Sequence, residues 1–192
     1  MNKVKALFAA LLMIGVAAPV VATPSYEDSD QIEEHIELLT TIENLGATVA
    51  INHPKLCGDK ANNVAGFWHG SMNLFALCQE NIRRSKVPVW NGSTVMLTDD
   101  DLDTIRHEAQ HVIQDCQDGT IDGRLQPYFS SPAKLSEFLE HYPDWKEESI
   151  VEEYSEDGAD SEIITLELEA WAVADLVSVE TIHEVLKREC SA

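Results

Sequence analysis

A short run near the middle of the chain carries the residue types of a metal-dependent hydrolase. Residues 107–111 read His-Glu-Ala-Gln-His, with two histidines four positions apart and a glutamate directly after the first. On a helix, residues four apart lie on one face, so both imidazoles can bind one metal ion. Glu108 can then take a proton from a metal-bound water, as peptide hydrolysis requires. The run supplies two candidate ligands, His107 and His111, and a candidate general base.

The residues around this motif predict a helix with one buried side. Thr98 begins a Thr-x-x-Asp variant of the capping box, and three aspartates occupy the expected first turn. Apolar residues then recur at helical spacing: Leu102, Ile105, Ala109, Val112, Ile113 and Cys116. His107, His111 and Gln114 form a stripe beside that apolar face. The motif is therefore expected on a partly buried helix, which is the context that a zinc site needs.

The expected third ligand is a glutamate on a later helix, because a catalytic zinc usually has three protein ligands and one open position. Residues 162–174 read as a mostly apolar helix whose notable polar residues are Glu167 and Glu169. A charge among apolar neighbours is costly unless it is paired or bound to a metal. The two glutamates point in different directions on a helix, so only one is expected to be a ligand. The alternative, in which both lie on a solvated edge, stays open.

The two segments together resemble the gluzincins, which are zinc peptidases with a downstream glutamate ligand. The run Glu-Leu-Glu-Ala-Trp that starts at Glu167 is similar to the Glu-x-x-Ala-Asp segment of the CaaX-prenyl endopeptidase family and of similar compact gluzincins. The resemblance implies that Glu167 binds zinc. The family's aspartate, which supports a ligand histidine, falls on Trp171 here, and this departure keeps Glu169 as the alternative ligand. Metzincins fit worse, since they need other residue types where this chain has Gln114 and Gln117.

The same resemblance implies an α+β, zincin-like fold, in which a small sheet with an edge strand packs on several helices including the motif helix. Residues 65–70 and 72–78 read as one strand or two short ones before that helix. Compact gluzincins place an edge strand there, and substrate pairs with it by strand addition. An ordinary core strand fits the pattern equally well.

These observations predict a zinc metallopeptidase that acts on a peptide or protein substrate. Zn²⁺ would be held by His107, His111 and Glu167, with Glu108 as the general base. A further donor is usually needed for the developing oxyanion, and the candidates are His69, Tyr128, His141, Tyr142 and Tyr154. Two alternatives stay open. A non-catalytic zincin-like binding module would explain Trp171 but not an intact Glu108, and an acidic metal-binding protein would explain only the charge.

The N-terminal residues and the composition indicate an exported domain. Residues 1–22 resemble a signal peptide, with two lysines, an apolar stretch and a small-residue cleavage site. Residues 23–192 would then be one α+β domain, secreted or periplasmic, that acts as a monomer without stable membrane association. An uncleaved membrane anchor is the alternative, although Pro19 interrupts the apolar stretch. A net charge of −21 argues against partners such as nucleic acid and anionic membranes.

The four cysteines of the chain predict two disulfide bonds, because an even number in an exported protein is typical of a disulfide framework. Three pairings are possible. We expect Cys57–Cys78, which would tie the strand region, and Cys116–Cys190, which would tie the C-terminal tail to the motif helix. A zinc site built from cysteines is not favoured, since no close cysteine pair exists.

Hydrophobic periodicity and turn residues outline the remaining elements. We expect further helices at 30–45, 134–141, 146–154 and 179–189, and a strand at 47–51. A hairpin around the Asn91-Gly92 turn, which is also part of a glycosylation sequon, is expected at 87–97. The loops are expected at 119–132 and, as a mobile acidic segment, at 152–160.

Overall fold

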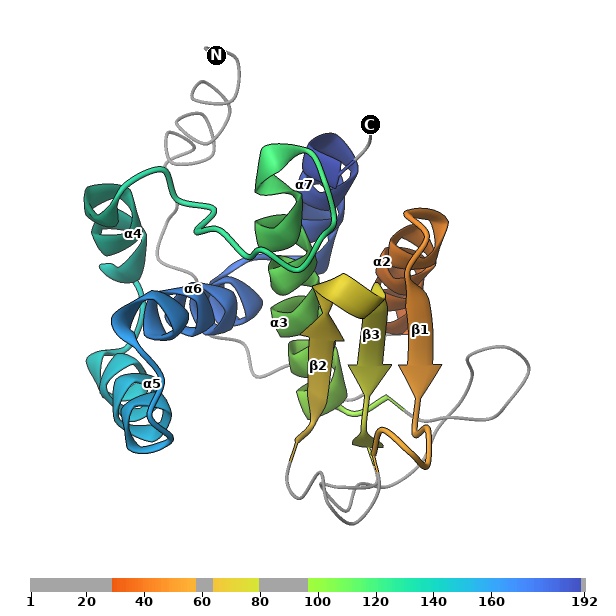
Figure 1. Ribbon diagram of the computed structural model, residues 1–192, viewed down its shortest axis with the longest axis horizontal. Helices are drawn as coiled ribbons and strands as arrows, with labels where there is room; N and C mark the ends of the chain where they lie inside the picture. The colour runs from red at the N-terminus through yellow and green to blue at the C-terminus, as the bar shows by residue number, and fades with distance from the viewer. Residues whose placement is uncertain (1–28, 58–63, 80–96, 191–192) are drawn as a thin grey trace.

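The computed structural model (Figure 1) describes residues 29–57, 64–79 and 97–190, and these ranges form an α+β fold. Within them lie six α-helices: α2 (Ser29–Asn44), α3 (Asp99–Asp115), α4 (Pro132–Leu139), α5 (Asp144–Glu156), α6 (Ser161–Leu176) and α7 (Val179–Cys190). The strands are β1 (Thr48–Ile51), β2 (Gly66–His69) and β3 (Leu74–Leu77). The predicted α+β class is thus confirmed.

The three strands form one small mixed sheet in the order β1-β3-β2. β1 runs parallel to β3, whereas β2 runs antiparallel to it, with Gly66 opposite Leu77 and His69 opposite Leu74. A short 3₁₀ turn links β2 to β3 and ends at Asn73, whose φ of 48° is left-handed. The segment before the motif helix therefore contains two short strands, and β2 lies at an edge of this sheet.

Helix α3 runs through the centre of the molecule and contacts elements on both sides. Figure 1 shows the sheet and α2 on one side of α3, and α4, α5 and α6 on the other. α6 and α7 pack against α3, and β2 approaches it from the sheet. The hydrophobic core contains fully buried side chains from α2, β3, α3 and α7, including Leu38, Ile42, Phe75, Leu77, Ile105, Ala109, Val112 and Leu186. Burial of each large side chain contributes about 1.5–3 kcal/mol.

Two disulfide bonds connect segments that are distant in the sequence, and both predicted pairings are confirmed. Cys57–Cys78 ties the residues after β1 to the end of β3, and Cys116–Cys190 ties the end of α3 to the end of α7. Disulfides form and persist in oxidising compartments, so the two bonds fit an extracellular protein.

The acidic segment 152–160 is not a loop throughout, and this prediction was wrong. Residues up to Glu156 continue α5, and only 157–160 connect it to α6, with a left-handed Gly158 at φ 83°. Glutamate is a good helix former, and the exposed acidic side chains of α5 face water, so acidity alone does not end a helix. The connection ends at Asp160, whose carboxylate accepts hydrogen bonds from the backbone N–H groups of Glu162 and Ile163 and caps α6.

Some predictions fall on parts of the chain that the structure does not describe. These are the signal peptide at 1–22, the sequon at 91–93 and, apart from Leu97, the hairpin at 87–97. Among the described helices, none combines the length and the apolar character that crossing a membrane requires.

Candidate metal centre

The start of α3 is held by a complete capping box, as the sequence predicts. The Thr98 hydroxyl accepts a hydrogen bond from the backbone N–H of Asp101, and Asp101 Oδ2 accepts one from the backbone N–H of Thr98 at 2.7 Å. Gln79 Nε2, just after β3, donates to the same carboxylate oxygen at 2.9 Å. The cap therefore fixes the first turn of α3 against the end of the sheet.

The two motif histidines on α3 face a glutamate from α6. His107 Nε2 lies 3.1 Å from His111 Nε2, and Glu167 Oε2 lies 3.3 Å from the first of these nitrogens and 3.4 Å from the second. Ligands on a tetrahedral zinc ion with bonds of about 2.0–2.1 Å lie roughly 3.3–3.4 Å apart. The spacing of the three atoms therefore fits a zinc-sized ion.

Glu108 completes the acidic side of the group. Its Oε1 lies 3.9 Å from His107 Nε2, and its side chain is only 7% exposed. The potential ligand atoms of His107, Glu108 and His111 all lie within 4.8 Å of one another, so this group could hold a metal ion. His107 and His111 share a helix face because they are four residues apart, and Glu108 comes within reach of them because it lies three residues before His111.

Strand β2 approaches this helix face closely at Gly66, a residue that the sequence analysis did not single out. A Cβ at Gly66 would lie 2.6 Å from Thr104 Cγ2, 2.9 Å from the Ala76 carbonyl oxygen and 3.4 Å from Glu108 Cγ. Only a residue without a side chain allows this approach. A glycine inside a predicted strand was the available signal, and its consequence is that the sheet edge lies against Glu108.

The orientation of His111 is set by a hydrogen bond on the side away from Glu167. His111 Nδ1 lies 2.7 Å from Gln114 Oε1, and Gln114 Nε2 donates to Glu169 Oε1 and to the Leu166 carbonyl oxygen, each at 3.0 Å. Nδ1 therefore carries the proton in this contact, and Nε2 faces His107 and Glu167. Histidine ligands of metals commonly donate their second ring N–H in this way.

Glu169 is fully buried and lies in a different environment from Glu167. Its carboxylate accepts hydrogen bonds from Gln110 Nε2, Gln114 Nε2 and the backbone N–H groups of Tyr128 and Phe129, at 2.9–3.3 Å. Burial raises the pKa of Glu169, and these donors oppose the rise. Glu169 thus anchors the loop 119–131 to α3 and α6, whereas Glu167 faces the imidazoles. The alternative in which both glutamates lie on a solvated edge is wrong, because Glu167 is only 18% exposed and Glu169 is not exposed at all.

The ring of His107 packs against an aromatic side chain of α6. Its ring lies against Trp171 with the centroids 4.2 Å apart at an angle of 42°. Its buried Nδ1 has no hydrogen-bond partner within the described part of the chain. Trp171 stands where the resembling family has an aspartate, and an aromatic face replaces the hydrogen bond that a carboxylate would supply.

Tyr154 on α5 is the candidate oxyanion donor that lies at this group. Its hydroxyl donates to Glu167 Oε2 at 2.8 Å and accepts from Trp171 Nε1 at 3.5 Å. Burial and the negative charge of Glu167 raise the pKa of Tyr154 well above its ordinary value, so the hydroxyl stays protonated. The other candidates lie in other contacts: the Tyr128 hydroxyl accepts from Arg188, Tyr142 is buried in a cluster with Leu168 and Ala172, and His69 and His141 are exposed.

The charges around the imidazoles favour a cation at this place. Burial by itself lowers the pKa of His111. The hydrogen bond to Glu167 and the charges of Glu108 and Glu167 outweigh burial and raise this pKa to about 9. Burial by itself raises the pKa of Glu167, but hydrogen bonds from His107 and His111 hold this pKa below its ordinary value. Two carboxylates in a largely buried space thus attract positive charge, which a proton or a metal cation can supply.

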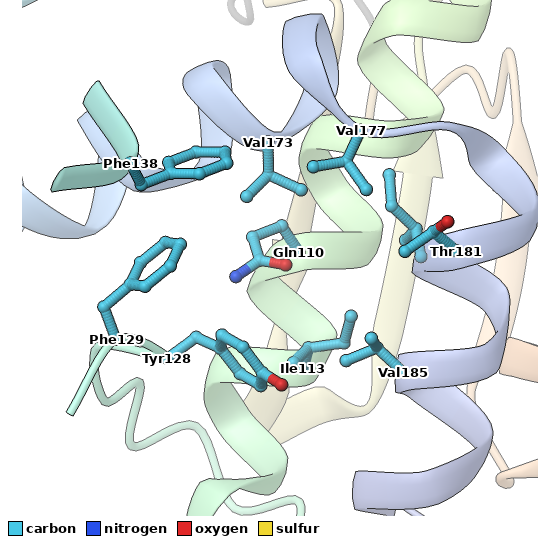
Figure 2. Close-up of a pocket in the computed structure, with 10 residues that line it drawn as sticks. Gln110, Ile113, Tyr128, Phe129, Phe138, Val173, Val177, Thr181 and Val185 are labelled. Carbon is cyan, nitrogen blue, oxygen red and sulfur yellow. The ribbon is translucent and has the colours of Figure 1, made fainter. Parts of the chain in front are cut away.

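A small apolar pocket lies near Gln110, whose side chain Figure 2 shows between the pocket walls. The volume open to the centre of a water molecule is about 20 Å³, enough for roughly one water. The pocket is lined by residues of α3, α4, α6, α7, the loop before α4 and the connection between α6 and α7: Gln110, Ile113, Tyr128, Phe129, Phe138, Val173, Val177, Thr181, Ile182 and Val185. None of His107, Glu108, His111 and Glu167 lines this pocket, so it is separate from the candidate metal centre.

Comparison with known proteins places the chain in a family but adds no activity. The chain belongs to the family described as a domain of unknown function (DUF8637), which matches residues 29–191. Neither the curated protein sequences nor the solved structures gave a match. The function must therefore be argued from the site itself.

Proposed function

We propose that this protein is an exported, zinc-dependent metallopeptidase of the gluzincin type with a zincin-like fold. The observation that carries the proposal is the meeting of His107 Nε2, His111 Nε2 and Glu167 Oε2 at mutual distances of 3.1–3.4 Å. These distances are close to the roughly 3.3–3.4 Å expected between two ligands of one tetrahedral zinc ion. A glutamate directly beside them, Glu108, has no purpose in a purely structural site but is required for hydrolysis.

In this proposal His107, His111 and Glu167 hold Zn²⁺. An ion bound by these three residues would supply the activation of water and the polarisation of a carbonyl oxygen that zinc hydrolases use. Glu108 takes the proton of the attacking water and passes it to the leaving amine, which becomes a neutral group as the peptide bond breaks. Its nearly complete burial keeps bulk water away from this proton transfer.

The edge of the sheet supports a peptide as the substrate. β2 pairs with β3 on one side, and its other side forms an edge of the described sheet. An extended peptide can add to such an edge through backbone hydrogen bonds. Because Gly66 brings β2 against Glu108, a peptide paired with β2 would pass close to the proposed base.

Tyr154 is the donor that we assign to the developing oxyanion. Its hydroxyl lies at Glu167 Oε2, next to the proposed ion, and it is held in the protonated form by burial. Such preorganised donors are typical of sites that stabilise an oxyanion.

Trp171 is the observation that favours the non-catalytic alternative, a zincin-like binding module. It leaves His107 Nδ1 without the carboxylate that usually supports a ligand histidine. This module would still bind zinc but would not need Glu108. The role of Glu108 therefore separates the two functions.

The experiment combines elemental analysis with a proteolysis assay on wild type and Glu108→Gln. Wild type purified without chelator should contain one zinc per chain and cleave unfolded protein or a peptide library. Glu108→Gln should fold, keep its zinc and lose about 10²–10⁴ in rate, the usual contribution of a general base. Glu148→Gln, a change at an exposed glutamate of α5, is the matched control and should be as active as wild type. If zinc-loaded wild type cleaves no substrate, the non-catalytic binding module is the correct function. If Glu108→Gln keeps full activity, the chemistry takes place at another site.

A further inference from the structure

The amide of Gln114 has partners that leave it only one orientation. Its Nε2 lies 3.0 Å from the Leu166 carbonyl oxygen and 3.0 Å from Glu169 Oε1. A carbonyl oxygen and a carboxylate oxygen only accept hydrogen bonds, so the NH₂ group of the amide must face them. Gln114 Oε1 must then face His111 Nδ1, which lies 2.7 Å away. An amide oxygen only accepts, so His111 must carry its proton on Nδ1.

We propose that Gln114 and Glu169 are positioning residues, which hold the His111 ring so that an unprotonated Nε2 can face the metal. This inference rests on the proposed metal site and names two residues that set its geometry without touching the ion. The other neutral form of His111 would carry its proton on Nε2, between His107 and Glu167, where it would exclude a cation. Gln114 disfavours that form because it would leave two acceptors, His111 Nδ1 and Gln114 Oε1, facing each other inside the protein.

Glu169 makes this arrangement rigid. Besides Gln114, its carboxylate accepts hydrogen bonds from Gln110 Nε2 and from the backbone N–H groups of Tyr128 and Phe129. It therefore connects α3, α6 and the loop before α4 through buried hydrogen bonds, which are costly to break in a dry interior. Glu169 and Glu167 lie two residues apart on α6. The placement of this one helix against α3 therefore positions both the proposed third ligand and the residue that anchors Gln114.

The two histidines should therefore depend on different supports. His107 Nδ1 has no hydrogen-bond partner in the described ranges, and its ring is held by Trp171. His111 is held by the Gln114 amide. Loss of that amide should free the His111 ring but leave the His107 ring in place.

The test compares Gln114→Met with Gln110→Met. Both glutamines are buried in α3 and donate to Glu169 Oε1, but the hydrogen bond with the His111 ring is made by Gln114. Gln114→Met should weaken zinc binding about 10–100-fold in chelator competition, the usual effect of losing an outer-shell partner. Gln110→Met should stay within about twofold of wild type, because Glu169 keeps its three other donors and the His111 contact is intact. Equal losses in both variants, or no loss in Gln114→Met, would overturn the proposal.

Imidazole ¹H–¹⁵N NMR gives a readout that a general loss of stability would not change. In wild type, with or without zinc, His111 should show an Nδ1–H signal that exchanges slowly with water. The signal should persist in Gln110→Met and should disappear or exchange rapidly in Gln114→Met. If Gln114→Met does not fold, the wild-type spectrum still decides: an Nδ1–H that is absent, or that exchanges as fast as that of the exposed His69, would refute the contact.

The two proposals fail in different ways. A protein that shows the protected Nδ1–H of His111 but binds no zinc refutes the metallopeptidase and also refutes a metal-positioning role for Gln114. A protein that binds zinc and cleaves peptides with equal zinc affinity in wild type and Gln114→Met refutes the positioning role alone.

Discussion

The Tyr154 hydroxyl donates a 2.8 Å hydrogen bond to Glu167 Oε2, the same atom that faces both motif imidazoles. One carboxylate oxygen of Glu167, a residue of α6, is thus contacted by side chains of both α3 and α5. Glu167 has two consequences for the site: it brings a negative charge to the histidines, and it holds a protonated phenol beside them. These two roles can be separated by mutation.

Glu167→Gln should lose zinc while the protein stays folded. The substitution keeps the size of the side chain and an oxygen, but removes the charge that the proposed ion requires. The loss of zinc affinity should exceed the roughly 100-fold that removal of an outer-shell partner causes. Elemental analysis after gel filtration measures it. The control is Glu162→Gln, an exposed glutamate in the first turn of the same helix, which should keep one zinc per chain. Zinc retained in Glu167→Gln would show that another group is the third ligand.

Tyr154→Phe should keep zinc but lower kcat by about 10²–10³, the usual effect of removing an oxyanion donor. KM should change little, because the hydroxyl is assigned to the transition state and not to binding of the ground state. Steady-state kinetics on a cleavable peptide separates the two parameters. Tyr142→Phe removes another buried hydroxyl, from the cluster with Leu168 and Ala172, and should keep wild-type kinetics. An unchanged kcat in Tyr154→Phe would contradict the assignment.

Gly66→Ala should destabilise the contact between β2 and α3. The added Cβ would lie 2.6 Å from Thr104 Cγ2, so the strand or the helix must shift, at a cost of about 1–3 kcal/mol. Urea unfolding measures this loss. Thr104→Ser removes Cγ2 but keeps the hydroxyl that donates to the Asp100 carbonyl oxygen. The double variant should therefore recover part of the stability, and strictly additive losses would argue against a direct clash.

His35 should make the protein less stable below about pH 6.5. Its Nδ1–H donates to the Gln31 carbonyl oxygen and its Nε2 accepts from Arg106, so a second proton has no acceptor. Burial, only partly opposed by the Gln31 hydrogen bond, lowers the pKa of His35 to about 4. The unfolded chain binds its proton near pH 6.5 and the folded one only near pH 4, so stability falls as the pH falls through this range.

At pH 5 this histidine should account for about 2 kcal/mol of lost stability relative to neutral pH. Urea unfolding at pH 7 and pH 5 measures the loss. His35→Gln should show a loss smaller by that amount, whereas His53→Gln, at an exposed position, should behave as wild type. An identical pH dependence in wild type and His35→Gln would contradict the lowered pKa.

Local features of the sequence were sufficient to predict the histidine pair on one helix face and the start of that helix. His107 and His111 share a face because helical geometry repeats every 3.6 residues, whatever the helix packs against. The capping box at Thr98 forms between residues three apart and is equally local. The acidic segment up to Glu156 shows the limit of local features, because its charge density predicts a loop although each glutamate favours a helix.

Only the tertiary structure determines which of the two glutamates of α6 faces the histidines. Glu167 and Glu169 are two residues apart in one helix, and their roles depend on which face of α6 packs on α3 and which meets the loop before α4. The contacts of Tyr154 and Gln114 were equally hidden, since each joins segments that are far apart in the chain. The physical reason is the range of the interactions. Backbone hydrogen bonds within a helix fix which residues share a face, but side-chain contacts between helices depend on the packing of the whole core.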